Sequence, residues 1–262
     1  MKKNSDKSKF EDLDFFNKNG YLKFFIYSKK EILEIKKEIK NDINFKIEKY
    51  LNIKKKLKNI ENYHNLKLEE SSHKFLIKPK HRYIKLKKNL LKKLLVNKKI
   101  IYLIKKTWGH TNISFHWIGD LKKKQKIKNA TGYRLARPAR LENNDTAGVH
   151  IDMNVGGIIN RDVDASLTVW IPIIGFDKKY TLRISPKSHK FDHGKIFKKT
   201  TKISPLLPKS YIKKFKFTRL SYKIGQAIIF HPNLLHGGSK NLGNQTRVSC
   251  DTRILNIKRF KY

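Results

Sequence analysis

The sequence has a single cysteine, Cys250, among its 262 residues. A scaffold held together by disulfides is therefore excluded, and a lone thiol is typical of a reducing compartment, so we expect a cytoplasmic protein. Glycine and proline are also scarce, at 13 and 7 residues, which excludes collagen-like and low-complexity chains. No apolar run approaches the roughly 18 residues that a membrane span needs. Because the segment from Met1 to Asp6 is basic and lacks an apolar stretch, we expect no signal peptide either.

Acidic residues are few, at 21 against 61 lysines and arginines, and the net charge is +40. Such a charge attracts phosphate and raises the hypothesis of a nucleic-acid binder. A nucleic-acid binder concentrates basic and aromatic residues on its working surface. Here no lysine lies between Asn129 and Asp177, the stretch with the most unusual chemistry. We therefore consider nucleic acid an unlikely partner.

Residues 1–128 form a lysine-rich part that we expect to be mostly helical. Apolar residues recur at near-helical spacing from Glu31 to Leu51 and again from Leu86 to Lys106, with charges between them. Basic amphipathic helices of this kind bind membrane surfaces or partners, or they pack an apolar stripe on a sheet while lysine stems cover the edges. We favour packing on a sheet.

Residues 129–262 change to short segments rich in β-branched and aromatic residues, separated by turn residues. The expected strands are 132–137, 148–155, 166–174, 181–185, 225–231 and 246–257. Short strands without intervening helices indicate an antiparallel sandwich or jelly roll. We therefore predict a mainly β fold with flanking α-helices and a double-stranded β-helix (jelly-roll, cupin-like) core, in one domain over residues 1–262.

Two histidines and one aspartate form the candidate metal site. Side chains two residues apart share one face of a strand, so His150 and Asp152 would present an imidazole and a carboxylate side by side. His236 follows the apolar segment from Ala227 to Phe230. Two histidines and one carboxylate on one side of a metal leave positions open, an arrangement typical of non-haem Fe(II) oxygenases. A single His-x-Asp motif is weak evidence, because it also occurs by chance.

Arg247 lies eleven residues after His236 and shares a strand face with Ser249. A guanidinium group can hold the far carboxylate of a dicarboxylic acid with two parallel hydrogen bonds. If 2-oxoglutarate chelates the iron through its keto acid, its second carboxylate requires such a cation. By the same alternation, Cys250 faces away from Arg247, and we expect a packed thiol without a catalytic role.

These motifs together resemble the phytanoyl-CoA dioxygenase family of Fe(II)- and 2-oxoglutarate-dependent oxygenases. His150-Ile151-Asp152 matches the first two iron ligands of that family, and His236 in the block from Phe230 to Asn241 matches the third. Arg247 stands where the family has its 2-oxoglutarate arginine. The resemblance covers residues 133–257 well and the first half only from Phe15 to Leu22.

The resemblance also implies two further residues beside 2-oxoglutarate. Trp170 matches an aromatic residue that the family uses there, although it could equally be a core tryptophan, and Tyr133 falls at another position that lines the co-substrate. The sequence departs from the family at Lys187, which replaces a glycine, and at Gln226, which replaces an aspartate. Both departures concern loop geometry rather than iron ligands.

The resemblance implies a dioxygenase that uses Fe(II), 2-oxoglutarate and O₂. Such an enzyme would hydroxylate a small biosynthetic metabolite or a carbohydrate-related substrate and release succinate and CO₂, with no catalytic residue beyond the metal centre. Four basic residues of the second half could meet an anionic or sugar-nucleotide substrate, or could be ordinary solvated charges, namely Arg137, Arg140, Arg161 and His189. The alternative is a metal-binding, cupin-like isomerase or sugar-binding module without oxygenase activity.

Overall fold

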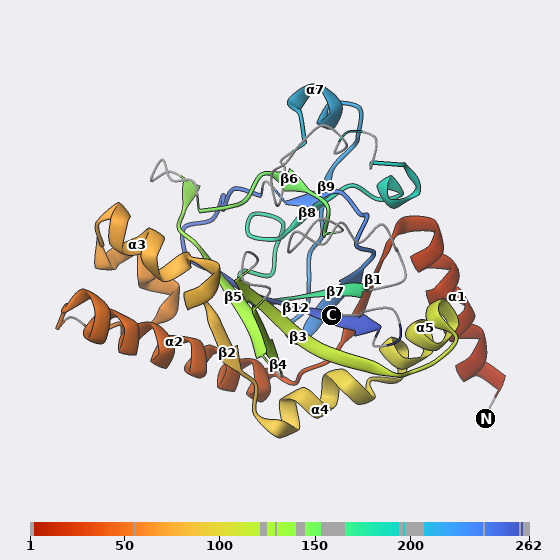
Figure 1. Ribbon diagram of the computed structural model, residues 1–262, viewed down its shortest axis with the longest axis horizontal. Helices are drawn as coiled ribbons and strands as arrows, with labels where there is room; N and C mark the ends of the chain where they lie inside the picture. The colour runs from red at the N-terminus through yellow and green to blue at the C-terminus, as the bar shows by residue number, and fades with distance from the viewer. Residues whose placement is uncertain are drawn as a thin grey trace.

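The computed structural model describes residues 3–54, 56–120, 125–128, 130–139, 145–152, 166–193, 196, 207–237, 239–256 and 258. Two antiparallel sheets lie face to face, and helices cover the outer side of the larger sheet (Figure 1). The prediction of a mainly β fold with flanking helices and a jelly-roll core is confirmed. No helix of these residues combines the length and the hydropathy of a membrane span.

The larger sheet has the strand order β1-β10-β7-β12-β3-β4, with β5 pairing to β12 and β2 pairing to β5. Its strands are β1 (Tyr21–Phe25), β2 (Tyr83–Lys85), β3 (Ile113–Asp120), β4 (Gln125–Lys128), β5 (Ala130–Ala136), β7 (Ser166–Ile174), β10 (Gln226–Phe230) and β12 (Arg247–Asn256). The smaller sheet has the order β6-β11-β8-β9. Its strands are β6 (Val149–His150), β8 (Arg183–Ile184), β9 (Thr218–Arg219) and β11 (His236–Gly237).

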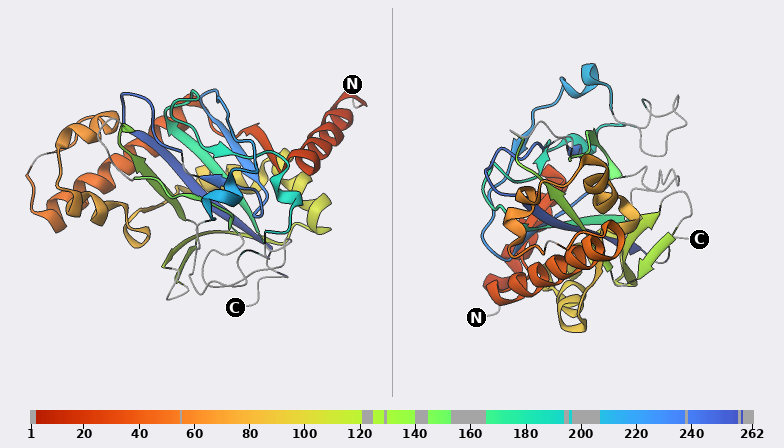
Figure 2. Two further views of the ribbon diagram at one scale, coloured as in Figure 1. Left: turned by 90° about the horizontal axis from the view of Figure 1, so that it is seen from above. Right: turned by 90° about the vertical axis from the view of Figure 1, so that its left-hand side faces the viewer.

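The first half of the chain contributes strands as well as helices. The helices are α1 (Lys3–Asn19), α2 (Lys29–Leu51), α3 (Glu70–Ile77), α4 (Lys88–Val96), α5 (Lys98–Trp108) and α7 (Lys209–Ile212), with 3₁₀ turns at η1 (Ile60–Leu66), η2 (Pro79–His81) and η6 (Ser188–Lys190). However, β1, β2, β3 and β4 also precede residue 129, and β1 pairs with β10, about two hundred residues later. Figure 2 shows α1 beside α5 at one end of the molecule and α3 at the other.

Helix α2 packs on the sheet as the sequence predicts. Its isoleucines at helical spacing are all buried, namely Ile32, Ile35, Ile39, Ile43 and Ile47. A capping box fixes its start: Ser28 accepts a hydrogen bond from the Glu31 amide, and the Glu31 carboxylate accepts one from the Ser28 amide. Such caps typically contribute about 1 kcal/mol.

The predicted helix from Leu86 to Lys106 is two helices that meet at Asn97. Oδ1 of Asn97 accepts hydrogen bonds from the amides of Lys99 and Ile100 and so caps a new helix. The spacing of apolar residues continues across this break, because both helices bury their apolar sides in the same core. Periodicity therefore predicts the buried face but not the interruption.

Strands β7 and β12 are buried on both faces. Their successive side chains pack alternately into two different clusters of buried residues. Val169 and Ile171 of β7 pack with the helices, whereas Trp170 between them belongs to the cluster between the two sheets. On β12, Cys250 joins the helix-facing core and Arg247 faces the cavity between the sheets. The prediction that Cys250 packs away from Arg247 is confirmed.

Candidate active site

His150 and His236 meet across the smaller sheet. His150 ends β6 and His236 begins β11, and the two residues are direct partners in the antiparallel pairing. Directly opposed residues project to the same face of a sheet. The two imidazole rings consequently lie with their centroids 4.4 Å apart.

The hydrogen bonds of both imidazoles direct their Nε2 atoms to one point. Nδ1 of His150 lies 2.8 Å from the carbonyl oxygen of Gly148, and Nδ1 of His236 lies 2.8 Å from that of Leu234. A carbonyl only accepts, so each Nδ1 carries the proton and each Nε2 presents a lone pair. Burial lowers the pKa of both histidines, that of His236 to about 4, so both are neutral near pH 7.

Asp152 completes the cluster from a loop rather than from a strand. Strand β6 ends at His150, and the Asp152 amide donates a 2.7 Å hydrogen bond to the Pro232 carbonyl, in the loop before His236. This bond brings the carboxylate to the histidines: Oδ1 lies 3.6 Å from Nε2 of His236 and 3.8 Å from Nε2 of His150. The strand predicted over residues 148–155 therefore ends at His150 in the structure. Residues 153–155 lie outside the described residues.

The Asp152 carboxylate is buried and held ionised. Burial by itself raises the pKa of this carboxyl, but the charge of Arg253, the two histidines and the hydroxyl of Thr168 together lower it well below its usual value. Nη2 of Arg253 lies 2.8 Å from Oδ1, and Oγ1 of Thr168 donates a 2.6 Å hydrogen bond to Oδ2.

Two neutral imidazoles and one carboxylate therefore offer their ligand atoms within 4.8 Å of one another. Mixed nitrogen and oxygen donors of this kind suit a divalent first-row metal, and two histidines with one carboxylate suit non-haem Fe(II). The donor set thus fits the metal that the sequence predicts.

Arg247 points into the cavity that the three candidate ligands line. It is buried, and its Nη1 donates to the carbonyl oxygens of Tyr180 and Ser239 at 3.1 and 2.9 Å. Its Nε has no hydrogen-bond partner among the described residues. Burial lowers the pKa of Arg247 to about 10, so the side chain remains a cation near pH 7. A buried donor without a partner is costly, so this atom is available to a group that enters the cavity.

Of the two predicted aromatic residues, the structure brings Trp170 to the cavity but not Tyr133. Trp170 lines the cavity and packs on Tyr222, with ring centroids 5.5 Å apart. Tyr133 lies opposite Cys250 in the pairing of β5 with β12, so it shares the helix-facing side of the sheet. Its hydroxyl donates a 2.6 Å hydrogen bond to Asp42 of α2. The neighbouring Arg134 is the residue of β5 that faces the cavity.

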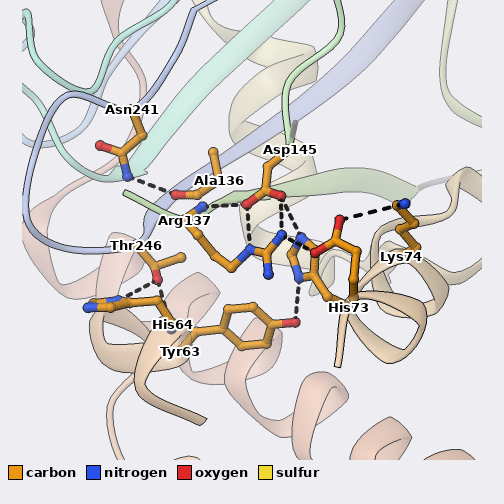
Figure 3. A network of polar contacts seen from close by, with 10 residues as sticks. Tyr63, His64, His73, Lys74, Ala136, Arg137, Asp145, Asn241 and Thr246 are labelled. Atoms are coloured by element: carbon orange, nitrogen blue, oxygen red, sulfur yellow. Dashed lines mark hydrogen bonds and ion pairs between the residues drawn. The ribbon is translucent and has the colours of Figure 1, made fainter. Parts of the chain in front are cut away.

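Arg137 takes part in a network of hydrogen bonds and ion pairs at the cavity wall (Figure 3). Its guanidinium contacts both oxygens of Asp145, at 2.8 and 3.0 Å, and also Glu70 of α3. Asp145 in turn bonds His73 at 2.9 Å, and His73 bonds the hydroxyl of Tyr63 at 2.8 Å. Because Asp145 lines the cavity, this network connects the cavity wall to η1 and α3.

The other basic residues that could meet an anionic substrate are His189, Arg140 and Arg161. His189 lies with Nε2 3.1 Å from the Asn17 carbonyl oxygen, against Gly20, and is not among the residues that line the cavity. Arg140 and Arg161 lie outside the described residues. Sequence reasoning missed Arg253, although its position six residues after Arg247 on the same strand face was a usable signal.

Residues 142–249 match the family model of phytanoyl-CoA dioxygenase (PhyH). This segment is thus similar in sequence to that family. The match includes His150, Asp152, His236 and Arg247, whereas Tyr133 precedes it. The phytanoyl-CoA dioxygenase family consists of oxygenases that use Fe(II), 2-oxoglutarate and O₂, so the chain is an oxidoreductase, and the predictions of family and enzyme class are confirmed.

Solved structures show the same fold at low sequence identity. SnoK, a non-haem α-ketoglutarate-dependent carbocyclase from nogalamycin biosynthesis, is 12% identical with a TM-score of 0.55, over 94% of this chain and 83% of SnoK. EctD from S. alaskensis, with 2-oxoglutarate and 5-hydroxyectoine, is 13% identical with a TM-score of 0.57, over 95% and 76%. AviO1 from Streptomyces viridochromogenes Tue57 is 11% identical with a TM-score of 0.52, over 95% of each chain. No curated protein matches the sequence.

Proposed function

We propose that the protein is an Fe(II)- and 2-oxoglutarate-dependent dioxygenase that hydroxylates a small biosynthetic metabolite or a carbohydrate-related substrate and releases succinate and CO₂. One observation carries this proposal. The cavity that holds the converging atoms of His150, Asp152 and His236 also holds a buried arginine, Arg247, with a donor that no described residue satisfies. A metal-binding module without a dicarboxylate co-substrate has no use for that cation.

His150, Asp152 and His236 would hold the iron, and their placement on one side leaves room for further ligands. Bound iron, with 2-oxoglutarate and O₂, supplies the oxidising chemistry, while the protein supplies orientation and a site with little water. The two backbone carbonyls at Gly148 and Leu234 fix the tautomer of each imidazole and increase its basicity.

Arg247 would bind the distal carboxylate of 2-oxoglutarate. Two carbonyls already orient its Nη1, and no described residue bonds its Nε. Trp170, Leu182 and Phe230 supply the apolar part of the wall. These side chains would keep water from the bound co-substrate, which strengthens the ion pair with Arg247.

The proposal of a metabolite or carbohydrate-related substrate has support from the relatives of the fold. The structure of EctD contains 5-hydroxyectoine, and that of the epimerase SnoN contains Fe³⁺, α-ketoglutarate and nogalamycin RO. Hydroxylation rather than halogenation is favoured here because Asp152 occupies the position that halogenating relatives leave free for chloride. A cytoplasmic location is part of the proposal, since the only cysteine is an unpaired buried thiol.

The decisive experiment is an anaerobic titration of the Fe(II)-loaded protein with 2-oxoglutarate, followed by the visible charge-transfer band of the chelate. The wild-type protein should bind one Fe(II) per chain and develop the band. His150→Ala or His236→Ala should abolish iron binding, because each removes one of three protein ligands. Tightly bound zinc in a closed four-ligand site would contradict the assignment.

Binding of 2-oxoglutarate by Arg247 variants distinguishes an oxygenase from the cupin-like alternative. Losing a buried pair of charge-assisted hydrogen bonds costs roughly 2–5 kcal/mol, so Arg247→Ala should weaken 2-oxoglutarate binding by roughly thirty- to several-thousand-fold. Arg247→Lys should fall between, because lysine keeps the charge but lacks the planar fork. Iron binding should be unchanged in both. A wild-type protein that binds iron without 2-oxoglutarate would support the isomerase or sugar-binding alternative.

A further inference from the structure

Arg253 is a second buried arginine in the same cavity, and it lies at the metal end. Nη2 of Arg253 is 2.8 Å from Oδ1 of Asp152, the oxygen that faces both histidines. Nη1 of Arg253 is buried and has no hydrogen-bond partner in the described part of the chain. The cavity is therefore lined by two buried cations, Arg253 beside the candidate metal ligands and Arg247, and each has one donor that the described residues leave unpaired.

The remaining charged groups of this cavity are already paired. Arg134 donates to both carboxylate oxygens of Asp251, at 2.8 and 3.1 Å, and Asp145 is bound by Arg137 and His73. These pairs leave Arg247 and Arg253 as the cavity arginines with an unsatisfied nitrogen among the described residues.

The present partner of Arg253 is also a candidate metal ligand. A divalent ion held by Asp152 would compete with Arg253 for Oδ1, and the guanidinium would then adjoin a second positive charge. Like charges in a buried site repel strongly, so an anion beside the metal would be stabilised by both. A planar guanidinium with two adjacent donors fits a carboxylate in particular.

We propose that Arg253 binds the carboxylate next to the keto group of 2-oxoglutarate, so that the co-substrate is held by one arginine at each end. This inference rests on the proposed function, since it presumes that a 2-oxo acid binds at the metal. It assigns to Arg253 a role distinct from that of Arg247: Arg253 recognises every 2-oxo acid, and Arg247 selects those with a distal carboxylate.

Binding of two acids, 2-oxoglutarate and 2-oxobutyrate, distinguishes the roles of Arg247 and Arg253. 2-Oxobutyrate has the keto acid end of 2-oxoglutarate but no distal carboxylate. Calorimetry with the Ni(II)-loaded protein, at saturating metal, measures the dissociation constants of both acids without turnover. The metal affinity of each variant is measured first, so that a loss of metal is not mistaken for a loss of acid binding.

Arg253→Gln should weaken 2-oxoglutarate and 2-oxobutyrate by the same factor, roughly ten- to a hundredfold, as expected for a charge-assisted contact. Arg247→Gln is the matched control and should weaken 2-oxoglutarate alone. Arg253→Lys, which keeps the charge near Asp152, should show a smaller loss for both acids. It replaces the Gln variant if thermal unfolding shows that Arg253→Gln does not fold.

Unchanged binding of 2-oxobutyrate in the Arg253 variants at saturating metal would overturn the inference and leave Arg253 as a residue that only positions Asp152. A loss confined to 2-oxoglutarate would overturn it as well. If the wild-type protein binds neither acid, the proposed function itself fails.

Discussion

Thr168, on strand β7 of the larger sheet, donates a 2.6 Å hydrogen bond to Oδ2 of Asp152. Both residues are buried, and the bond leaves Oδ1 as the oxygen that faces His150 and His236. The hydroxyl thus fixes the rotation of the carboxylate and presents a single oxygen to a metal.

Thr168→Val should therefore weaken binding of a divalent metal without unfolding the protein. Partners that orient a metal ligand typically contribute ten- to a hundredfold in metal affinity. Thr168→Ser keeps the hydroxyl and serves as the matched control. Competition with a chelator, measured with Co(II) or Fe(II), checks this prediction, and it is wrong if the valine and serine variants bind metal equally well.

The site was largely predictable because its geometry rests on local rules. Strand alternation correctly separates Arg247 from Cys250 on β12. The same rule, combined with the register of β5 against β12, places Tyr133 with Cys250 and away from the cavity. That register depends on residues more than a hundred positions apart, and no local pattern reveals it. The prediction about Tyr133 came from the family resemblance alone, without this pairing.

Other features of the fold could not be predicted from sequence patterns, because they depend on long-range contacts or on single side chains. The pairing of β1 with β10 joins segments about two hundred residues apart, and periodicity in either segment does not indicate its partner. The break at Asn97 follows from one side-chain cap within a continuous apolar pattern. Asp152 reaches the histidines through a loop contact with Pro232, not through the continuous strand that the sequence indicates.

The network in Figure 3 predicts how stability depends on pH. Burial raises the pKa of Asp145, but His73 and Arg137 outweigh it and lower the pKa to about 2 from an ordinary value of 3.8. Because the folded-state pKa lies below the unfolded one, ionised Asp145 stabilises the fold above about pH 4. That stabilisation, about 2 kcal/mol, is lost as the pH falls toward 2.

Asp145→Asn should lower the free energy of unfolding near pH 6 and should flatten its decline between pH 5 and pH 2. Urea unfolding across this range measures both effects. Glu70→Gln is the control, because the Glu70 side chain is 49% exposed and its ion pair with Arg137 contributes little at any pH. Parallel pH profiles for the wild type and Asp145→Asn would contradict the prediction.

Cys250 should be chemically inert in the folded protein. Its side chain is fully buried in the helix-facing core, and burial raises its pKa well above the ordinary value, so almost no thiolate forms near pH 8. A thiol reagent should label it only after unfolding. Cys250→Ala should retain metal and 2-oxoglutarate binding. A folded Cys250→Ala protein that binds metal but no 2-oxoglutarate would place the thiol in the site after all.

Lys187 holds a left-handed backbone conformation, with φ 69° and ψ −9°, at the start of the turn η6. This is the position at which the phytanoyl-CoA dioxygenase family usually has glycine. A side chain in this conformation costs roughly 1–2 kcal/mol, whereas glycine adopts it without strain but loses roughly 0.5–1 kcal/mol through the entropy of the unfolded chain. Lys187→Gly should therefore raise the free energy of unfolding by about 0.5 kcal/mol.

Two control variants separate the backbone effect from the loss of the lysine side chain. Lys187→Ala removes the side chain but keeps the strain, so it should give no gain in stability. Lys190→Gly, at the end of the same turn, relieves no left-handed strain and should destabilise by roughly 0.5–1 kcal/mol. Urea unfolding ranks the three proteins. If Lys187→Gly is no more stable than Lys187→Ala, the left-handed conformation at this position carries no such strain and the prediction is wrong.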